Sequence, residues 1–407
     1  MNVRTYIKEN WKNSVKTPDT RCRGIVKMPT SYTVPCMREG FTDFYYWDTY
    51  FTNVGLLLDG MEEQAQRNLD VMAYFIDALG YVPNASNILD RSQPPLFVRG
   101  VYDLWRKTGD DAVLPRYMNQ MEAEYRFFML DRMTPCGLNA YGTYLCRSRL
   151  LLDYPWLSER VGHFAAEDDT EGKIALSRDL FSIAESGWDF NYRFRTERTP
   201  FDARVFAHVD LCSLLFDVEC KLALMKEHLG DTEAAARYRA AAEGRRALMD
   251  TYMRDPQTGV YYDYNFVSGT RSDILSAASL YPYALGVSDD RDGLLRVLNA
   301  LELPCGLSAS AYRGEGEKYL QWDYPSMWPS NVYFATVALD RLGLREDAHR
   351  IAGKYADTVE RVFGEQGDLY EKYDARDGSV SVTSEYETPS MLGWTAGVYA
   401  FLKDNGL

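Results

Sequence analysis

Four segments of the chain place tryptophan close to carboxylates. Trp-Asp pairs stand at 47–48, 188–189 and 322–323, and Ser-Glu-Tyr-Glu-Thr-Pro at 384–389 leads into Gly-Trp at 393–394. Flat rings can stack on the apolar faces of a sugar, while carboxylates bind its hydroxyls. A carboxyl against an indole also loses contact with water, which raises its pKa towards that of a general acid. The pattern indicates a carbohydrate site, although any one segment alone could equally be core packing with an aspartate cap.

The elements that must position these segments are mostly helices. Gly60, Gly109, Gly230, Gly286 and Gly343 each follow an amphipathic helical pattern and precede residues that can open another helix. Most intervals are about 50–60 residues, and the interval from 109 to 230 is about twice that, as if one junction near 170 lacked its glycine. Six units of two helices predict an all-α fold, a six-hairpin (α/α)6 toroid. An open helical solenoid used for protein binding is the alternative.

The length of the chain agrees with a closed toroid. Its 407 residues exceed the size, about 250–300 residues, at which one core usually divides into domains. No Pro-, Ser- or Gly-rich linker interrupts the sequence. We therefore predict a single catalytic domain over residues 1–407, with residues 1–32 as an N-terminal extension packed on the toroid.

Charge and hydropathy narrow the classes of partner. The formal net charge of −14 argues against nucleic acids and anionic membranes, and no apolar run is long enough to span a bilayer. We expect a small neutral saccharide as ligand, no nucleic acid, no membrane, and a monomer or weak homo-oligomer. The seven cysteines form no CxxC pair and the N-terminus has no apolar core of a signal peptide, so the expected location is cytoplasmic, with free thiols.

The tryptophan segments belong to a longer series of motifs. In chain order these are Phe-Tyr-Tyr-Trp-Asp-Thr-Tyr-Phe at 44–51, Pro-Asn and Arg-Ser-Gln-Pro-Pro within 83–95, Ala-Glu-Ser-Gly-Trp-Asp-Phe at 184–190, Gln-Trp-Asp-Tyr-Pro at 321–325, and Glu-Tyr with Gly-Trp-Thr-Ala-Gly-Val within 385–398. The series resembles, in the same order, the signature segments of the trehalase family, glycoside hydrolase family 37, or of a close relative in the same clan of inverting glycosidases. The resemblance implies a six-hairpin α/α toroid that hydrolyses an α-glycosidic bond with inversion.

Carried over residue by residue, the resemblance implies a catalytic pair without a metal or cofactor. Asp189 would be the general acid and Glu385 the general base, with Glu387 as a rival two positions on. Inversion requires carboxyls about 6.5–9.5 Å apart, because a water must fit between the base and the sugar. The resemblance further implies that the sugar pocket is shaped by Phe41, Tyr45, Trp47, Asp48, Asn84, Arg91, Gln93, Trp188, Trp322, Asp323 and Trp394. Asp323 could bind a hydroxyl or hold Trp322.

The sequence departs from the family on the side of the second sugar. Gly40 stands before Phe41, where trehalases carry an arginine. The arginine-containing stretch that precedes the acid motif in trehalases is also altered, and Arg160 is its only candidate counterpart. We expect a wider and less polar leaving-group site, and trehalose to be hydrolysed less well than the best substrate.

The sequence thus predicts an inverting exo-α-glycosidase, trehalase-like, that acts on a small α-glucoside or related disaccharide. An α-mannoside or glycosylglycerate hydrolase of the same clan is the near alternative. From another class, a sugar epimerase would want paired histidines, which the sequence does not show, and a non-catalytic sugar-binding protein would retain both carboxylates for no chemical reason.

Overall fold

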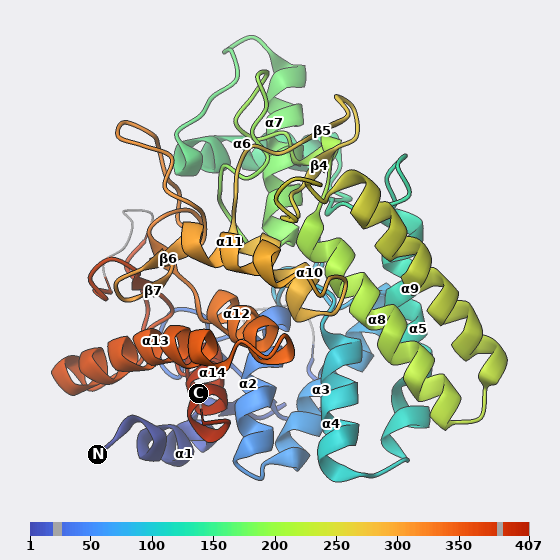
Figure 1. Cartoon of the computed structure of the whole chain (residues 1–407), viewed down its shortest axis with the longest axis vertical. Coiled ribbons are helices and arrows are strands. Elements are labelled where there is room, and N and C mark those ends of the chain that lie inside the picture. The colour runs from blue at the N-terminus through green and yellow to red at the C-terminus, as the bar shows by residue number, and fades with distance from the viewer. Residues whose placement is uncertain (19–26, 381–385, 407) are drawn as a thin grey trace.

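Six helices form a closed inner ring in the computed structural model, which describes residues 1–18, 27–380 and 386–406. Each inner helix packs on the next in chain order, and the last packs on the first (Figure 1). The ring therefore confirms the predicted (α/α)6 toroid rather than an open solenoid. Its members are α2 (Tyr46–Leu58), α4 (Phe97–Thr108), α8 (Val209–His228), α10 (Tyr281–Ala284) continued from the 3₁₀ turn η2 (Ala277–Leu280), α12 (Pro329–Arg341) and α14 (Gly393–Asp404).

Each inner helix has an outer partner. Five pairs are consecutive in the chain, whereas the sixth joins α14 to α1, so the two ends of the described chain complete the ring. The outer helices are α3 (Glu62–Leu79), α5 (Val113–Asp131), α9 (Thr232–Tyr252), α11 (Arg291–Leu301), α13 (Arg345–Gln366) and α1 (Val3–Ser14).

Glycines form the turns from inner to outer helices, as the sequence predicts. All five predicted positions lie in these turns, with φ between 65° and 86°. Left-handed backbone of this kind costs glycine nothing, so it can end one helix and reverse the chain. The prediction for the long interval is wrong in one respect, however. The interval does hold a hairpin near residue 170, but that hairpin has a glycine of its own, Gly162 with φ 61°, and it lies outside the ring.

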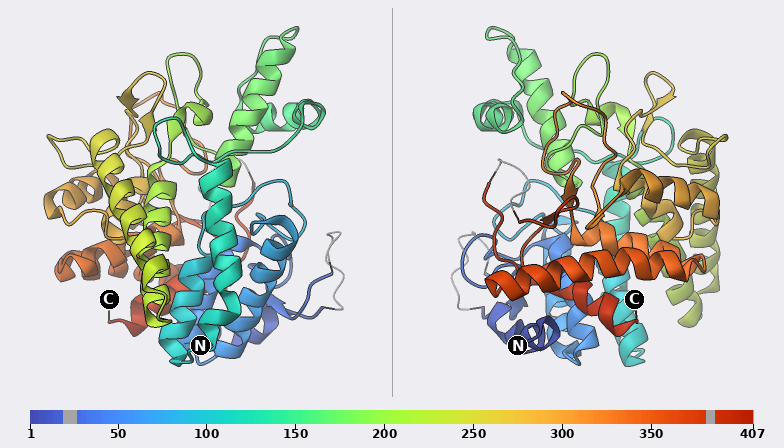
Figure 2. Two further views of the ribbon diagram at one scale, coloured as in Figure 1. Left: turned by 90° about the vertical axis from the view of Figure 1, so that its right-hand side faces the viewer. Right: turned by 60° about the vertical axis from the view of Figure 1, so that its left-hand side comes forward.

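This added hairpin consists of α6 (Arg147–Val161) and α7 (Thr170–Glu185). It stands above the ring in Figure 1 and projects from the body in both views of Figure 2. Its apolar side chains, among them Leu150, Leu157 and Phe181, belong to a second hydrophobic cluster, distinct from the main one inside the ring. The hairpin therefore carries much of its own packing.

Strands are short and confined to the connections. Within residues 1–18, 27–380 and 386–406 they form four small antiparallel sheets, ordered β1-β2, β3-β4-β5, β6-β7 and β8-β9. Their bounds are β1 (Val15–Lys16), β2 (Tyr32–Thr33), β3 (Phe206–Ala207), which follows the 3₁₀ turn η1 (Ala203–Val205), β4 (Tyr264–Asn265), β5 (Thr270–Arg271), β6 (Glu302–Leu303), β7 (Gly306–Leu307), β8 (Ser326–Met327) and β9 (Tyr373–Asp374).

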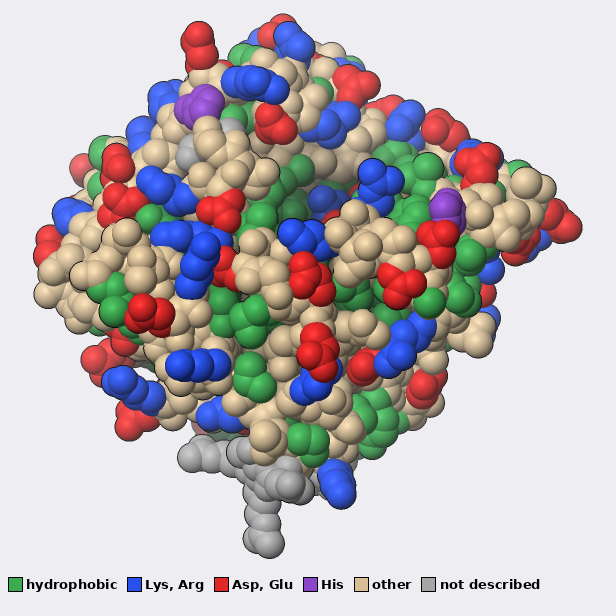
Figure 3. Space-filling model, turned by 90° about the horizontal axis from the view of Figure 1, so that it is seen from below, with side chains coloured by type: hydrophobic (Ala, Val, Ile, Leu, Met, Phe, Trp, Pro, Cys, Tyr) green, Lys and Arg blue, Asp and Glu red, His purple; other side chains and the backbone are tan. Residues whose placement is uncertain are grey.

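The surface carries both signs of charge. Acidic and basic side chains are interspersed over the face seen from below in Figure 3. Among the described residues, no helix combines the length and apolar character needed to cross a membrane.

The seam of the ring depends on Asp59, at the end of α2. Its carboxylate accepts hydrogen bonds from Arg4 at 2.6 and 2.7 Å and from the indole N–H of Trp11 at 2.7 Å, both on α1. Arg4 also donates to Asp404 of α14. One carboxylate thus fastens α1 to α2, and α1 in turn holds α14.

We expect Asp59→Ala to lower the free energy of unfolding by about 2 kcal/mol, because it removes charge-assisted hydrogen bonds and leaves the Trp11 N–H without its acceptor. Urea unfolding of the variant would measure this. Glu365→Ala is the matched control, since its ion pair with Arg361 is largely exposed and should change stability by less than about 0.5 kcal/mol. Equal stability of both variants would contradict the role given to the seam.

Candidate active site

The inner helices all begin at the same end of the ring, because each returns through an outer helix that runs the other way. The motif residues sit at those starts: Trp47 and Asp48 in the first turn of α2, Trp328 as the N-cap of α12, and Trp394 in the first turn of α14. A cavity of about 430 Å³ opens there. Its lining residues are Phe41, Tyr45, Trp47, Asp48, Asn84, Ile88, Arg91, Gln93, Trp156, Arg160, Gly187, Asp189, Gln321, Trp322, Trp328, Glu371, Tyr386 and Trp394.

The inner wall of the cavity is aromatic. Trp322 stacks on Trp328 with ring centroids 3.8 Å apart, and the edges of Trp47 and Trp394 meet this stack at 6.1 and 5.6 Å. All four rings are almost completely buried. Trp188 stacks on Trp322 at 5.1 Å and does not line the cavity. The wall is therefore a rigid apolar surface of the kind on which a sugar ring packs.

Asp189 follows the C-terminal end of α7 and reaches the cavity from the added hairpin. Arg160 of α6 places Nη2 3.2 Å from a carboxylate oxygen of Asp189 and 3.2 Å from its backbone carbonyl. Gln321 donates to the same carbonyl at 2.9 Å. The Asp189 side chain is 34% exposed. Trp188 is packed between Trp322 and Arg193.

Glu371 is a second cavity carboxyl, which sequence analysis missed. It lies in the connection between α13 and α14 and accepts a hydrogen bond from Lys372 at 2.7 Å. The Tyr386 hydroxyl lies 2.8 Å from each of its carboxylate oxygens. No tryptophan adjoins Glu371 in sequence, so it does not belong to a tryptophan–carboxylate pattern of the kind that identified the other residues. The signal available was the sequence Glu-Lys-Tyr-Asp at 371–374, in which a glutamate has a counter-charge beside it.

Asp48 and Glu371 are destabilised as anions. Loss of water raises the pKa of Asp48 to about 8, and the negative charge of Glu371 adds to the rise. Burial also raises the pKa of Glu371, and this effect outweighs the opposing charge of Lys372 and the hydrogen bond from Tyr386. The negative charge of Asp189 adds to both shifts, and ionised Glu371 makes Asp48 harder to ionise.

The structure brings together most of the predicted site residues. Asp189 lies in the cavity wall, as do nine of the eleven proposed sugar-binding residues, the exceptions being Trp188 and Asp323. Asp323 is buried and accepts hydrogen bonds from the backbone N–H groups of Leu320 and Tyr192, both at 3.1 Å, so it fixes the loop beside Trp322. Glu385 lies outside the described residues. Its rival Glu387 is exposed and lines a different cavity.

The sequence profile of the Trehalase family matches residues 2–405. The chain belongs to the trehalase family. It is 32% identical to the periplasmic trehalase of Xanthomonas campestris pv. campestris over 98% of this chain and 72% of that protein. It is also 32% identical to the periplasmic trehalase of Escherichia coli O8 over 92% of this chain and 68% of that protein. It is accordingly a glycoside hydrolase.

Solved structures show the same fold. The neutral trehalase Nth1 of Saccharomyces cerevisiae superposes with a TM-score of 0.76 at 22% identity, over 98% of this chain and 79% of that one. A GH63 mannosylglycerate hydrolase of Thermus thermophilus superposes with a TM-score of 0.68 at 16% identity, over 99% of this chain and 100% of that one. At these identities the likeness establishes the toroid alone.

The expected cytoplasmic location is wrong, because the curated trehalase relatives are named as periplasmic enzymes. The six described cysteines are indeed free thiols. Free thiols do not identify a reducing compartment, however, since a cysteine without a partner in reach stays unpaired wherever the protein resides.

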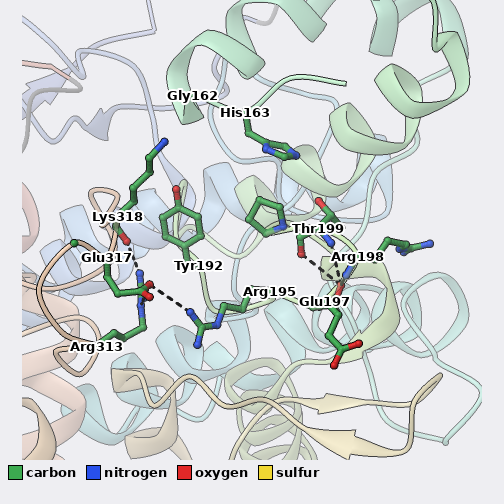
Figure 4. A pocket seen from close by; sticks show the side chains of 13 residues that line it. Gly162, His163, Tyr192, Arg195, Glu197, Arg198, Thr199, Arg313, Glu317 and Lys318 are labelled. Atoms are coloured by element: carbon green, nitrogen blue, oxygen red, sulfur yellow. Dashed lines mark hydrogen bonds and ion pairs between the residues drawn. The ribbon is translucent and has the colours of Figure 1, made fainter. Parts of the chain in front are cut away.

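Another cavity, of about 490 Å³, lies beside the C-terminal end of α6 and is shown in Figure 4. Its lining is charged, and two of its arginines are held in ion pairs: Arg195 with Asp273 and Glu317, and Arg198 with Asp202. Its lining includes none of Asp48, Asp189 and Glu371. We therefore assign the chemistry to the tryptophan-lined cavity.

The pKa of Asp48 makes a prediction about stability. Its folded-state pKa of about 8 exceeds its ordinary value of 3.8, so folding is favoured when the group is protonated. That contribution is complete below about pH 4 and is lost as pH rises towards 8. Asp48→Asn should therefore match the wild type near pH 4 and exceed it by about 2–5 kcal/mol near pH 8.

Thermal unfolding of both proteins across this range tests the prediction. Asp289→Asn is the control, since that side chain is 84% exposed and the difference from wild type should not change with pH. If the difference in stability between Asp48→Asn and the wild type did not change with pH, the pKa of Asp48 would not be raised by folding.

Proposed function

We propose that the chain hydrolyses α,α-trehalose and related α-glucosides with inversion, with one glucose in the tryptophan-lined inner part of the cavity. The observation that carries this is the meeting of Asp189, Glu371 and Asp48 around a cavity with an apolar aromatic wall. The names of the relatives support glucose as the inner sugar and trehalose as a substrate. The mannosylglycerate hydrolase, which shares only the fold, gives no comparable support for the alternative substrates.

Asp189 is proposed as the general acid. It transfers its proton to the glycosidic oxygen as the bond from that oxygen to the anomeric carbon breaks. A water attacks the anomeric carbon from the opposite face and loses a proton to the base, which leaves β-glucose and the free leaving alcohol. Arg160, 3.2 Å from the carboxylate, then stabilises the negative charge that forms on Asp189.

For the base we propose Glu371. Burial raises its pKa, which makes its carboxylate a better proton acceptor. Hydrogen bonds from Lys372 and Tyr386 fix the direction in which the carboxylate points. Glu385, the base implied by the sequence resemblance, adjoins Tyr386 in the chain. It could therefore take either the role of base or that of a second sugar ligand, and an experiment must separate it from Glu371.

Asp48 and Gln93 are proposed to bind the inner glucose. The Gln93 carbonyl oxygen accepts the backbone N–H of Trp47 at 3.0 Å, which fixes the amide and leaves its NH₂ group to face the cavity. Asp48, with its pKa of about 8, is partly protonated at neutral pH and can both donate to and accept from sugar hydroxyls.

We expect Asp189→Asn to lower kcat/KM on trehalose by at least about 10²-fold, the lower range for a lost general acid. The same variant should lose much less on α-glucosyl fluoride, because fluoride leaves without a proton. Steady-state kinetics on both substrates measure this. Equal losses would show that Asp189 does not act as the acid. NMR of the first-formed product from the wild type should show the β anomer.

The base can be identified by chemical rescue. Glu371→Ala should lower kcat/KM on trehalose by at least about 10²-fold. Azide should restore turnover of α-glucosyl fluoride by this variant, because azide attacks in place of water and gives β-glucosyl azide. Glu385→Ala should not be rescued, and the exposed Glu387→Ala should retain near-wild-type activity. Rescue of Glu385→Ala instead would assign the role of base to Glu385, as the resemblance implies.

A further inference from the structure

The outer part of the cavity lacks the arginine that the resemblance leads one to expect at position 40. Gly40 has φ +88°, and a Cβ built there would meet Pro389 at 3.2 Å and Cys36 at 3.4 Å. Gly40 lines a different cavity, with Asp368 and Tyr370. A side chain at this position would therefore be strained, and the wall must be supplied from elsewhere.

Helix α6 of the added hairpin supplies the outer wall of the cavity. Trp156 lines the cavity and is 45% exposed, whereas the four inner tryptophans are at most 4% exposed. This gradient places Trp156 at the mouth of the cavity. Arg160, one turn further on the same helix face, reaches Asp189. A sugar cleaved next to Asp189 would thus direct its leaving group towards Trp156.

The exposure of Trp156 is not explained by packing. Its one ring neighbour among the described aromatics is Phe181, 6.4 Å away and edge-on. The next residue, Leu157, fills the hairpin's hydrophobic cluster, so the helix does not need Trp156 for its own core. A large apolar ring left half-open at the mouth of a ligand cavity is suited to receive a ligand face.

We propose that Trp156 is the stacking platform for the leaving group and determines specificity on that side, an inference that rests on the proposed function. Stacking lacks the direction of a hydrogen bond, so it selects the leaving group by its flat apolar face more than by its hydroxyl pattern. Apolar contacts discriminate between ligands by about 10–200-fold, far less than fixed polar contacts do. Trehalose is consequently one of several accepted α-glucosides, consistent with the altered leaving-group side of the sequence.

The test compares two substrates that share the inner glucose. Trehalose has a leaving group that reaches Trp156, and α-glucosyl fluoride has one too small to do so. Trp156→Ala should lower kcat/KM on trehalose about tenfold, through KM in particular, and change it less than about twofold on the fluoride. Trp156→Leu, which keeps an apolar side chain without a ring, should show the same split, and Trp156→Phe should restore most of the activity on trehalose.

Leu152→Ala is the matched control. It lies one turn earlier on α6, is 68% exposed, and does not line the cavity, so neither substrate should be affected. Equal losses on both substrates, or no loss on trehalose, would overturn the role of Trp156. A wild-type enzyme that hydrolyses neither substrate would instead refute the proposed function, which keeps the two failures distinct.

Discussion

The direction of the inner helices is the constraint on which the rest of the structure depends. Because every inner helix returns through an outer one, all six begin at one end of the ring, and residues near those beginnings meet although they are far apart in the chain. Trp47, Trp328 and Trp394 come together in this way. The partial positive charge of the helix N-termini also points towards the cavity, where it favours the ionised forms of nearby carboxyls. Closure of the ring, completed by α1 and α14, fixes the diameter within which these side chains pack.

The helix N-termini favour ionised carboxyls, but burial in the cavity has the opposite effect on Asp48 and Glu371 and raises their pKa. Asp48 is nearly buried, and Glu371 lies close enough that its charge acts on Asp48. The aromatic core beneath these groups, with Trp322 and Trp328 stacked face to face, contributes burial that opposes this cost. Under the proposed function this unfavourable burial would serve recognition, since a sugar's hydroxyls can supply the hydrogen bonds that water no longer provides. Stability and activity would then be opposed at these few side chains.

The fold could be predicted largely from glycine positions and helical periodicity, since local backbone preferences decide where helices end. The sixth ring pair could not, because α1 and α14 meet only through long-range packing. Trp47, Asp48 and Asp189 were found because tryptophan beside aspartate is a visible local pattern. Glu371 lacked such a pattern, and its importance arises from burial and from Tyr386, which only the folded chain reveals. The prediction of a cytoplasmic location failed for a different reason. Cysteines stay unpaired when no partner lies within reach, so free thiols do not identify the redox environment.

The added hairpin has a consequence for how this enzyme could diversify. It joins the ring through connections at its two ends, packs largely on its own apolar cluster, and yet brings to the cavity both Asp189 and the Trp156 face. The proposed proton donor and the proposed leaving-group wall therefore belong to one segment of the chain, while the proposed glucose-binding residues belong to the ring. Under the proposed function, grafting residues 147–189 between relatives would transplant leaving-group preference together with a matched acid, so new substrates would become accessible by recombination without rebuilding the toroid.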